Sequence, residues 1–406
     1  MKEYQLNVDP RILELLGPNL YTNIYYVLAE LVANAYDADA HNVYVISNKD
    51  DIRIEDDGHG MSYKNGEIKK FLNVAGVSRS KEEESMTRSG ERRKMGRKGV
   101  GKLAALSVSE SVDVMTICDN EKSGFVLSRR PIDGNKLQPI SDNDIKFVYI
   151  QNHGTAIVMR NPQYRLNKSM DSVKRNLLKI FPLVNDDFKI HIVRGNEIVT
   201  IDTFDENITK ELCAFISLGD DFSDLAVNVP DKYPAKRAEL VEQRVSYTEP
   251  VSLKDNAGEN HEYTLEITGW IGAYASTRGR KATLTDFPDN FISLYANKKM
   301  GEFNILPIVG QNKLNEVYVV GQLYVDLFEL SELPDMALSN RQGYKSDDPR
   351  YEAVIKYVRT VLLPDILRKR SLYSIEQNRE KKQRKLIEQK NSSSGCIDRS
   401  IFLSWK

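Results

Sequence analysis

A helix that carries polar residues among its apolar ones constrains this chain most. Residues 20–40, LYTNIYYVLAELVANAYDADA, have the apolar spacing of an amphipathic helix. Glu30, Asn34 and Asp37 are spaced i, i+4 and i+7, which places them on one helix face together with Val27. A carboxylate and an amide oxygen one turn apart can activate water and bind Mg²⁺. A polar stripe on an ordinary helix has the same pattern, so this segment alone leaves both interpretations open.

Two strands are predicted after this helix. NVYVIS and DIRIEDD alternate between apolar and polar residues and are joined by a polar turn. The second strand buries Ile52 and Ile54 and then runs into the sequence 56–60, DDGHG. An acidic residue before glycines at a strand end can accept a hydrogen bond from an exocyclic amine, and the glycines let the backbone approach a ligand. Asp-Gly is also a common turn pair, so an ordinary turn is the alternative.

The segment 94–106, KMGRKGVGKLAAL, resembles a P-loop but lacks two of its features. Leu103 stands where a P-loop carries the hydroxyl residue that binds Mg²⁺, and the preceding SGERRKM cannot form a buried strand. Glycines that lead into a helix are still suited to holding an anion, because their backbone N–H groups can approach it. We expect LAALSVS to form that helix.

These segments and one more follow each other in a known order. Glu-x-x-x-Asn-x-x-Asp-Ala at 30–38, Asp-x-Gly-x-Gly at 56–60, Gly-x-x-Gly-x-Gly at 96–101 and HGT at 153–155 resemble the GHKL ATPases: gyrase B, the ninety-kilodalton heat-shock chaperone, histidine kinases, MutL and the related MORC proteins. The resemblance is strong over residues 15–160 and is closest to the prokaryotic MORC-like or heat-shock-like group. It implies an α+β fold with an N-terminal Bergerat-type ATP-binding α/β sandwich. An α/β transducer domain and a basic C-terminal helix would follow.

The resemblance also implies ATP and Mg²⁺ as ligands and gives roles to single positions. Glu30 would be the general base, Asn34 would coordinate Mg²⁺ and Asp37 would support the site. Asp56 would accept a hydrogen bond from the adenine amine, with Thr155 helping through water. The remaining residues implied at the nucleotide are Gly58, Gly60, Met61, Gly96, Gly99, Val100, Gly101 and Lys102.

Some neighbouring residues receive no firm role. Asp57 stands where relatives often have Asn or Thr, so we do not assign it the adenine contact. His59 and His153 occupy variable positions beside motif glycines, and we expect neither to be catalytic. Residues 79–81 could touch phosphate from the lid, although a solvated run of charges is the alternative.

Relatives also bring a cation from the transducer domain to the γ-phosphate, and two segments compete for this role. LPDMALSNRQGY at 333–344 is similar to the chaperone's loop and nominates Arg341, although Asn340 is an extra residue in that register. LYANKKMGEF at 294–303 is similar to the strand where MutL-type proteins carry an Asn-Gly-Arg turn, and it nominates Lys298 or Lys299. We favour Arg341 as the catalytic cation.

The expected division of the chain follows from these motifs. Residues 1–165 would form the ATP-binding domain with a lid at about 62–102, residues 166–367 the transducer-like domain, and residues 368–406 a basic helical tail with a flexible end. Residues 368–390 hold nine Lys/Arg against three Glu. This segment could bind DNA electrostatically, or be a solvated helix or a coupling helix to a partner.

Composition and length restrict the functions. The 406 residues carry a net charge of −1, so a nucleic-acid partner would have to meet a local patch. Three separated cysteines, no signal peptide and no long apolar run favour the cytoplasm and no membrane partner. A histidine kinase would place its ATPase domain last, and the chain is too short for a full heat-shock chaperone.

We therefore expect an ATPase that acts as an ATP-gated homodimeric clamp or remodelling subunit on a macromolecule. It would work with a protein partner or operon-encoded subunit, in DNA transactions or antiviral defence. A chaperone-like ATPase acting on protein clients is the alternative.

Overall fold

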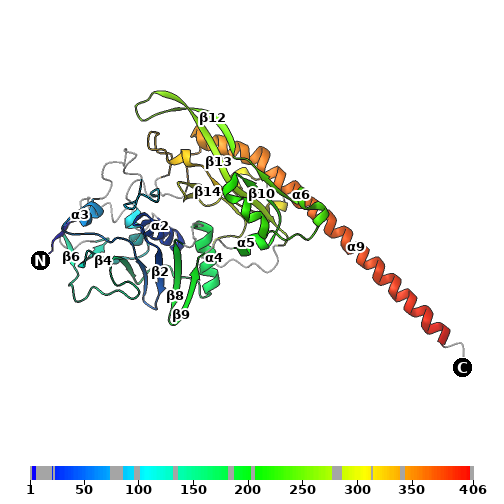
Figure 1. Cartoon of the computed structure of the whole chain (residues 1–406), viewed down its shortest axis with the longest axis horizontal. Helices are drawn as coiled ribbons and strands as arrows, with labels where there is room; N and C mark the ends of the chain where they lie inside the picture. Colours follow the sequence, from blue (N-terminus) through cyan, green and yellow to red (C-terminus); the bar gives the residue numbers. More distant parts are fainter. Residues whose placement is uncertain are drawn as a thin grey trace.

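The computed structural model describes residues 2–5, 21, 23–73, 86–95, 101–130, 136–181, 187–202, 206–276, 286–311, 314–338 and 343–402. Side chains at Lys102, residues 206–207 and residues 390–402 are outside this description. Within it the chain forms two β-sheets with a helical layer between them, and one long helix that projects from the second sheet (Figure 1). The expected α+β fold with a long C-terminal helix is confirmed.

The first sheet has nine strands in the order β1-β6-β5-β4-β7-β3-β2-β8-β9. Only the β2–β8 pair among them is parallel. The strands span β1 Tyr4–Gln5, β2 Asn42–Ser47, β3 Asp51–Asp56, β4 Ser111–Cys118, β5 Glu121–Ser128, β6 Lys136–Pro139, β7 Gly154–Arg160, β8 Lys189–Arg194 and β9 Glu197–Ile201.

Helices cover one face of this sheet. They are α2 (Ile24–Asp37), α4 (Met170–Ile180), the short α3 (Glu67–Leu72) and a 3₁₀ helix η2 (Gly101–Ser107). The Asn23 side chain caps α2 by accepting a hydrogen bond from the Tyr25 N–H. Beyond this cap, buried residues such as Leu28 and Val32 pack α2 into the core.

Two local predictions differ from this arrangement. LAALSVS (103–109) is predicted as a helix, but only its first five residues lie in a helix, the seven-residue 3₁₀ helix η2, whose Leu103, Ala104, Ala105 and Leu106 are all buried. Residues 188–201 fall within the predicted transducer-like domain (166–367), yet here they form β8 and β9, which extend the first sheet to Ile201. The parallel pairing of β8 with β2 joins segments about 150 residues apart, and local periodicity carries no signal for it.

The second sheet has seven strands. Its order is β11-β10-β13-β16-β14-β15, and β12 pairs with the outer part of β13. The strands span β10 Leu212–Leu218, β11 Val241–Arg244, β12 Tyr247–Lys254, β13 Asn260–Tyr274, β14 Phe291–Ala296, β15 Lys299–Glu302 and β16 Val319–Tyr324. Short helices connect them: α5 Glu206–Lys210, η3 Asp220–Asn228, η4 Pro234–Lys236, α6 Arg237–Leu240, α7 Leu306–Val309, η5 Leu314–Tyr318 and η6 Asp326–Glu329.

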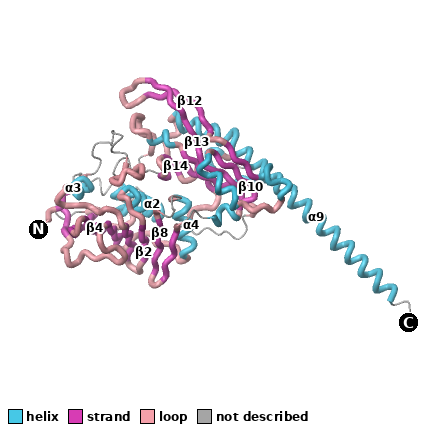
Figure 2. Tube along the Cα trace, viewed as in Figure 1, coloured by secondary structure: helices cyan, strands magenta, loops and turns pink. Residues whose placement is uncertain are grey.

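The second sheet lies between two helical layers (Figure 2). One face packs against α8 (Pro349–Tyr357), the π-helical turn Val358–Leu362 and the start of α9 (Leu363–Phe402). Side chains of the other face, including Phe291 and Val320, join the core around α2 and α4. The domain boundary is polar as well, because Lys179 of α4 pairs with Asp289 at 2.9 Å.

The C-terminal helix is longer than its composition suggests. Residues 391–402 have turn and linker composition, but their backbone continues α9 to Phe402. Adding residues to an existing helix is far easier than nucleating one, so weak helix formers such as Ser392 and Gly395 can still extend it.

Candidate functional site

The polar face of α2 is where the predicted residues meet. The Glu30 side chain is buried, with 8% of the residue exposed, whereas Asn34 one turn later is exposed. Gly101, the last glycine of the 96–101 motif, lies directly against both. A Cβ atom at Gly101 would be 2.2 Å from Glu30 Oε2 and 3.9 Å from Asn34 Oδ1. Gly101 and the polar face of α2 therefore lie together, and glycine is required at position 101 for this close approach.

A lysine from the second sheet reaches the same carboxylate. Lys299 Nζ lies 2.8 Å from Glu30 Oε2, and both side chains are largely buried. Lys299 begins β15, directly after a tight turn in which Asn297 and Lys298 both have positive φ, at 46° and 64°. Two left-handed residues are typical of a type I′ hairpin turn, and this turn sets the direction of Lys299. The Asn297 N–H also donates to Asp326 Oδ1 at 2.7 Å, which fixes the turn to η6.

The loop 333–344, which carries the competing cation candidate, has its described ends near Glu30 and Lys299. Ala337 and Tyr344 form an isolated β-bridge, and Tyr344 packs so closely on Gly301 that a Cβ there would be 1.6 Å from its hydroxyl oxygen. A small cavity of about 30 Å³ lies between the two sheets. It is lined by Glu30, Met95, Ala296, Lys299, Met300, Gly301, Glu329, Ala337 and Tyr344. Arg341, the favoured cation, lies outside the described residues, so its assignment stays a prediction beside the observed Lys299 contact.

Asp56 lies at the other end of the site, where β3 ends. Its carboxylate accepts the Gly58 N–H at 3.0 Å, and the residue is paired with Thr155 across β3 and β7. Burial removes water from this carboxylate and raises its pKa to about 7, against the lowering effect of the Gly58 N–H. The Asp56 carboxyl is therefore a buried acceptor whose pKa no described cation lowers. Such an acceptor suits an amine that a ligand donates.

The glycines around Asp56 are required by the backbone. Gly60 has a φ of +70°, and a Cβ there would be 2.1 Å from the carbonyl oxygen of Ile117. At Gly58 a Cβ would be 2.7 Å from the carbonyl oxygen of Ala38. This segment can therefore wrap closely around the end of β4 and the end of α2 only with glycine at both positions.

Thr116 of β4 is a site residue that the sequence analysis missed. Its buried hydroxyl accepts the Met61 N–H at 2.9 Å and donates to the Gly154 carbonyl at 3.0 Å. It lies 3.5 Å from the Thr155 hydroxyl. Thr116 thus fixes Met61 and Thr155 relative to one another. A threonine within an alternating strand has no distinguishing sequence signal, because it is also a common strand residue.

Asp37 contacts the segment 86–95, which lies within the predicted lid. Its Oδ1 accepts the N–H of Met95 at 2.7 Å, the residue directly before the glycine motif. Asp39 accepts both the N–H and the hydroxyl of Ser89 at 2.8 Å. Arg92 donates to the carbonyl oxygens of Ala40 and Asp187 at 2.6 and 3.0 Å. Residues 86–95, which fall within the predicted lid, are therefore fastened to the end of α2.

Several predicted residues lie outside the description. Gly96, Gly99 and Val100 of the glycine motif belong to this group, as do residues 79–81 and the Lys102 side chain. Asp57 and the two histidines have local contacts: Asp57 accepts the backbone N–H groups of His41 and Asn42 at 2.7 Å, and the His153 ring contacts the Gly58 carbonyl at 2.8 Å.

The chemistry of this donor set fits a magnesium nucleotide. Glu30 and Asn34 offer oxygen atoms of the kind that Mg²⁺ prefers, beside a glycine whose missing side chain leaves room for a phosphate. Asp56 offers a buried acceptor at the far end. None of the helices in the described part of the chain combines the length and hydropathy of a membrane span.

Comparison with known proteins agrees with this geometry. The family model of histidine kinase-, DNA gyrase B- and HSP90-like ATPases matches residues 21–155. Over residues 21–155 the chain is similar to this ATPase family. We name this segment the GHKL domain after the match; it contains Glu30, Asn34, Asp56 and Gly101, and ends at Thr155. Proteins of this family bind ATP.

A relative extends the similarity beyond the GHKL domain. A proposed type II restriction enzyme, HgiDII, from Herpetosiphon aurantiacus is 26% identical over 363 residues. The match covers 88% of this chain and 54% of the relative, so the chain spans about half the length of the protein it matches.

Proposed function

We propose that the chain binds ATP with Mg²⁺ in the GHKL domain and hydrolyses it with Glu30 as general base. One observation carries this proposal: Gly101 of the glycine motif and Lys299 of the second sheet both contact the Glu30 carboxylate. A base must lie where the phosphate chain ends, and a glycine loop with a lysine beside it marks that place.

The proposed reaction assigns each of these residues one task. Glu30 takes a proton from water, the water oxygen bonds to the γ-phosphorus, and the bond to the leaving ADP oxygen breaks. Lys299 lies where it can stabilise the negative charge of the γ-phosphate, and Arg341 is the alternative cation for this task. Asn34 would hold Mg²⁺, which neutralises phosphate charge when it is bound.

Asp56 would recognise the adenine amine. Thr116 keeps Met61 and Thr155 in place around it. Asp37 would support the site through the predicted lid, since its Oδ1 accepts the N–H of Met95.

We further propose that ATP gates a homodimeric clamp or remodelling subunit that acts on a macromolecule in a DNA transaction or in antiviral defence. The observed contact between the ATP-binding site and the second sheet supports a nucleotide-dependent change in their arrangement. The relative's description as a restriction enzyme supports DNA as the client. A protein partner or a subunit encoded nearby remains part of this proposal.

Replacing Glu30 tests the ATPase. Glu30→Ala should lower the rate of ATP hydrolysis to background while ATP binding is kept, because the base acts on water. Glu91→Ala, which changes an exposed acid of the ordered lid segment, is the matched control and should keep the wild-type rate. Hydrolysis by Glu30→Ala at the wild-type rate would show that the assigned mechanism is wrong.

A further inference from the structure

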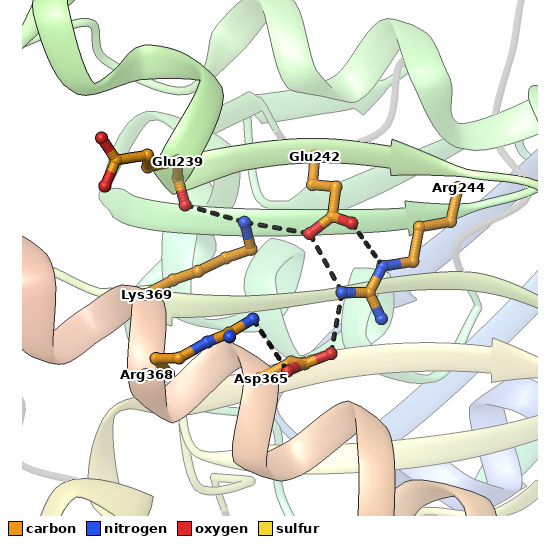
Figure 3. A network of polar contacts seen from close by, with 6 residues as sticks. All are labelled: Glu239, Glu242, Arg244, Asp365, Arg368 and Lys369. Carbon is orange, nitrogen blue, oxygen red and sulfur yellow. Dashed lines mark hydrogen bonds and ion pairs between the residues drawn. The ribbon is translucent and has the colours of Figure 1, made fainter.

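The long helix α9 has an anchored half and a free half. Leu363, Ile366 and Tyr373 pack into the core of the second sheet. Ion pairs reinforce this attachment: Lys369 and Arg244 both contact Glu242, and Arg244 also contacts Asp365 (Figure 3). This part of the helix is therefore fixed to the second sheet.

The last described contact with the body is at Glu380. Its carboxylate contacts the Tyr233 hydroxyl at 3.0 Å and Lys232 Nζ at 3.3 Å. From residue 381 to residue 389 every side chain is exposed, and Figure 1 shows the helix leaving the body. Residues 381–402, which we name the arm, continue for roughly 33 Å at 1.5 Å per residue.

The acidic side chains at the start of the arm are already paired. Glu376 contacts Arg379 at 2.7 Å, and Glu380 contacts Arg384 at 2.5 Å in addition to Lys232. These contacts offset the charge of both glutamates. Glu388, exposed and three positions after Lys385, is the acid of the described arm that lies on the same face as the lysines.

Three lysines of the arm remain without an acidic partner. Within the described part of the chain, Lys381, Lys382 and Lys385 form no ion pair, and Lys381 only contacts the Gln377 amide oxygen at 3.5 Å. Lys381 and Lys385 are spaced i, i+4, and Lys382 and Lys385 are spaced i, i+3, so the three side chains are neighbours on one face. We name this face the lysine stripe.

The charge of the chain is divided between this helix and the body. Residues 381–402 carry six Lys/Arg against Glu388 and Asp398, a net charge of +4, which leaves the other residues with −5. A polyanion is therefore attracted more strongly to the arm than to the body, which favours its alignment along the arm.

The sequence around the lysine stripe favours one occupant. The segment 376–385, EQNREKKQRK, has no apolar residue, and the exposed Leu386 and Ile387 that follow it are adjacent positions, not the repeating seam of a coiled coil or the continuous apolar face of a membrane-surface helix. Residues 374–390 contain no aromatic side chain on which the bases of a single strand could stack. A regular double helix needs neither feature, because its phosphates are all on the outside.

We propose that the lysine stripe binds the phosphate backbone of double-stranded DNA without sequence preference. This inference rests on the proposed function, since it identifies the macromolecular client as DNA. Three phosphate contacts correspond to a slope of log K against log salt of about −2.7, or about a 40-fold loss of affinity between 50 and 200 mM salt.

The test compares three versions of the full chain on a labelled random-sequence duplex of about 30 base pairs. Lys381→Gln/Lys382→Gln/Lys385→Gln should weaken binding at low salt and make the salt slope shallower by about 2.7. Lys122→Gln/Lys146→Gln/Lys254→Gln removes the same charge from exposed sites on the body and should leave the slope unchanged. Replacing the three arm lysines by arginine should keep binding. This variant shows whether the loss in the glutamine variant comes from the missing charge or from a change in folding.

Three outcomes would overturn the inference. They are an unchanged affinity and slope in the arm variant, an equal loss in the body variant, or tighter binding of oligo-dT or of anionic phospholipid vesicles than of the duplex. The ATPase is read separately. If the wild-type chain hydrolyses no ATP while the lysine-dependent duplex binding is present, the proposed ATPase is wrong and the DNA contact stands.

Discussion

Lys299 Nζ and Glu30 Oε2 are 2.8 Å apart, although the two residues lie 269 positions apart in the sequence. Glu30 belongs to α2, which covers the first sheet, and Lys299 belongs to β15 of the second sheet. The proposed base therefore has a cationic neighbour from the second sheet. A γ-phosphate beside Gly101 would compete with Glu30 for this lysine. In the proposed function, ATP binding would in this way affect the contact between the GHKL domain and β15.

Replacing Lys299 tests this link. Lys299→Ala should lower ATP turnover by about 100-fold, because removing one preorganised donor from a reacting phosphate has an effect of this order. Lys299→Arg should restore part of the rate. Turnover and nucleotide affinity are measured separately, and the larger effect is expected in turnover.

Lys298→Asn is the matched control for Lys299. Asparagine tolerates the φ of 64° at this turn position, so the hairpin is kept while one positive charge is removed. A loss of turnover as large in Lys298→Asn as in Lys299→Ala would contradict the specific role of Lys299.

Gly101→Ala should abolish hydrolysis. The new Cβ would lie 2.2 Å from Glu30 Oε2, so either the glycine loop or the carboxylate has to move. We expect a cost in folding stability of about 1–3 kcal/mol, as for other overpacked positions, measured by chemical denaturation. Gly195→Asn is the control, because this glycine has a φ of +57° and open space around it. Wild-type turnover in Gly101→Ala would contradict the close contact.

Nucleotide affinity should depend on pH through Asp56. Burial raises the pKa of this carboxyl to about 7, so below pH 7 the ligand-free protein holds a proton that must leave before an amine can donate to the carboxylate. The affinity for a non-hydrolysable ATP analogue should therefore rise between pH 6 and pH 8, by at most about tenfold per pH unit.

The raised pKa of Asp56 also affects the stability of the fold, but stability changes with pH in the opposite direction to nucleotide affinity. Because the folded state holds this proton more tightly than the unfolded chain, the contribution of Asp56 to stability is largest at acidic pH and is lost as pH rises through 7. Asp56→Asn should remove both pH dependences and weaken nucleotide binding. Calorimetric titration of the ATP analogue between pH 6 and pH 8 measures the affinity. An affinity of the wild-type protein that does not change with pH would disprove the role assigned to Asp56.

Glu242 should matter for the attachment of α9. Hydrogen bonds from Arg244 and then Lys369 lower its pKa to about 2, so it stays ionised in all but strongly acidic solution. Glu242→Gln should destabilise the protein by about 1 kcal/mol, a value kept small because these side chains are partly exposed. Stability from this carboxylate is present above its ordinary pKa and is lost as pH falls toward 2. Glu239→Gln is the control, since only the backbone carbonyl of Glu239 joins this network.

The parts of the fold that depend on local spacing could be predicted from the sequence. β2 and β3 begin and end within the predicted segments, and α2 presents Glu30 and Asn34 on the predicted face. These elements follow from apolar periodicity, which local sequence carries. The position of β8 and β9 could not be predicted, because it depends on a parallel pairing between distant segments.

The site shows the same division. Asp56, Gly58 and Gly60 could be proposed from the sequence because a strand end followed by glycines is a local pattern. Thr116 was missed because its role depends on the alignment of β4 with β7. Lys299 was ranked below Arg341 because the choice depends on how two loops of the second sheet meet α2, and sequence register alone does not show which side chain arrives.

The continuous run of α9 from the second sheet into the arm has a mechanical consequence. The arm is a lever whose pivot is the sheet that contacts Glu30 through Lys299. A rotation of that sheet by about 10° would sweep the end of a 33 Å lever through roughly 6 Å, close to one helical pitch. In the proposed function, small rearrangements beside Glu30 would thereby be amplified at the far end of α9.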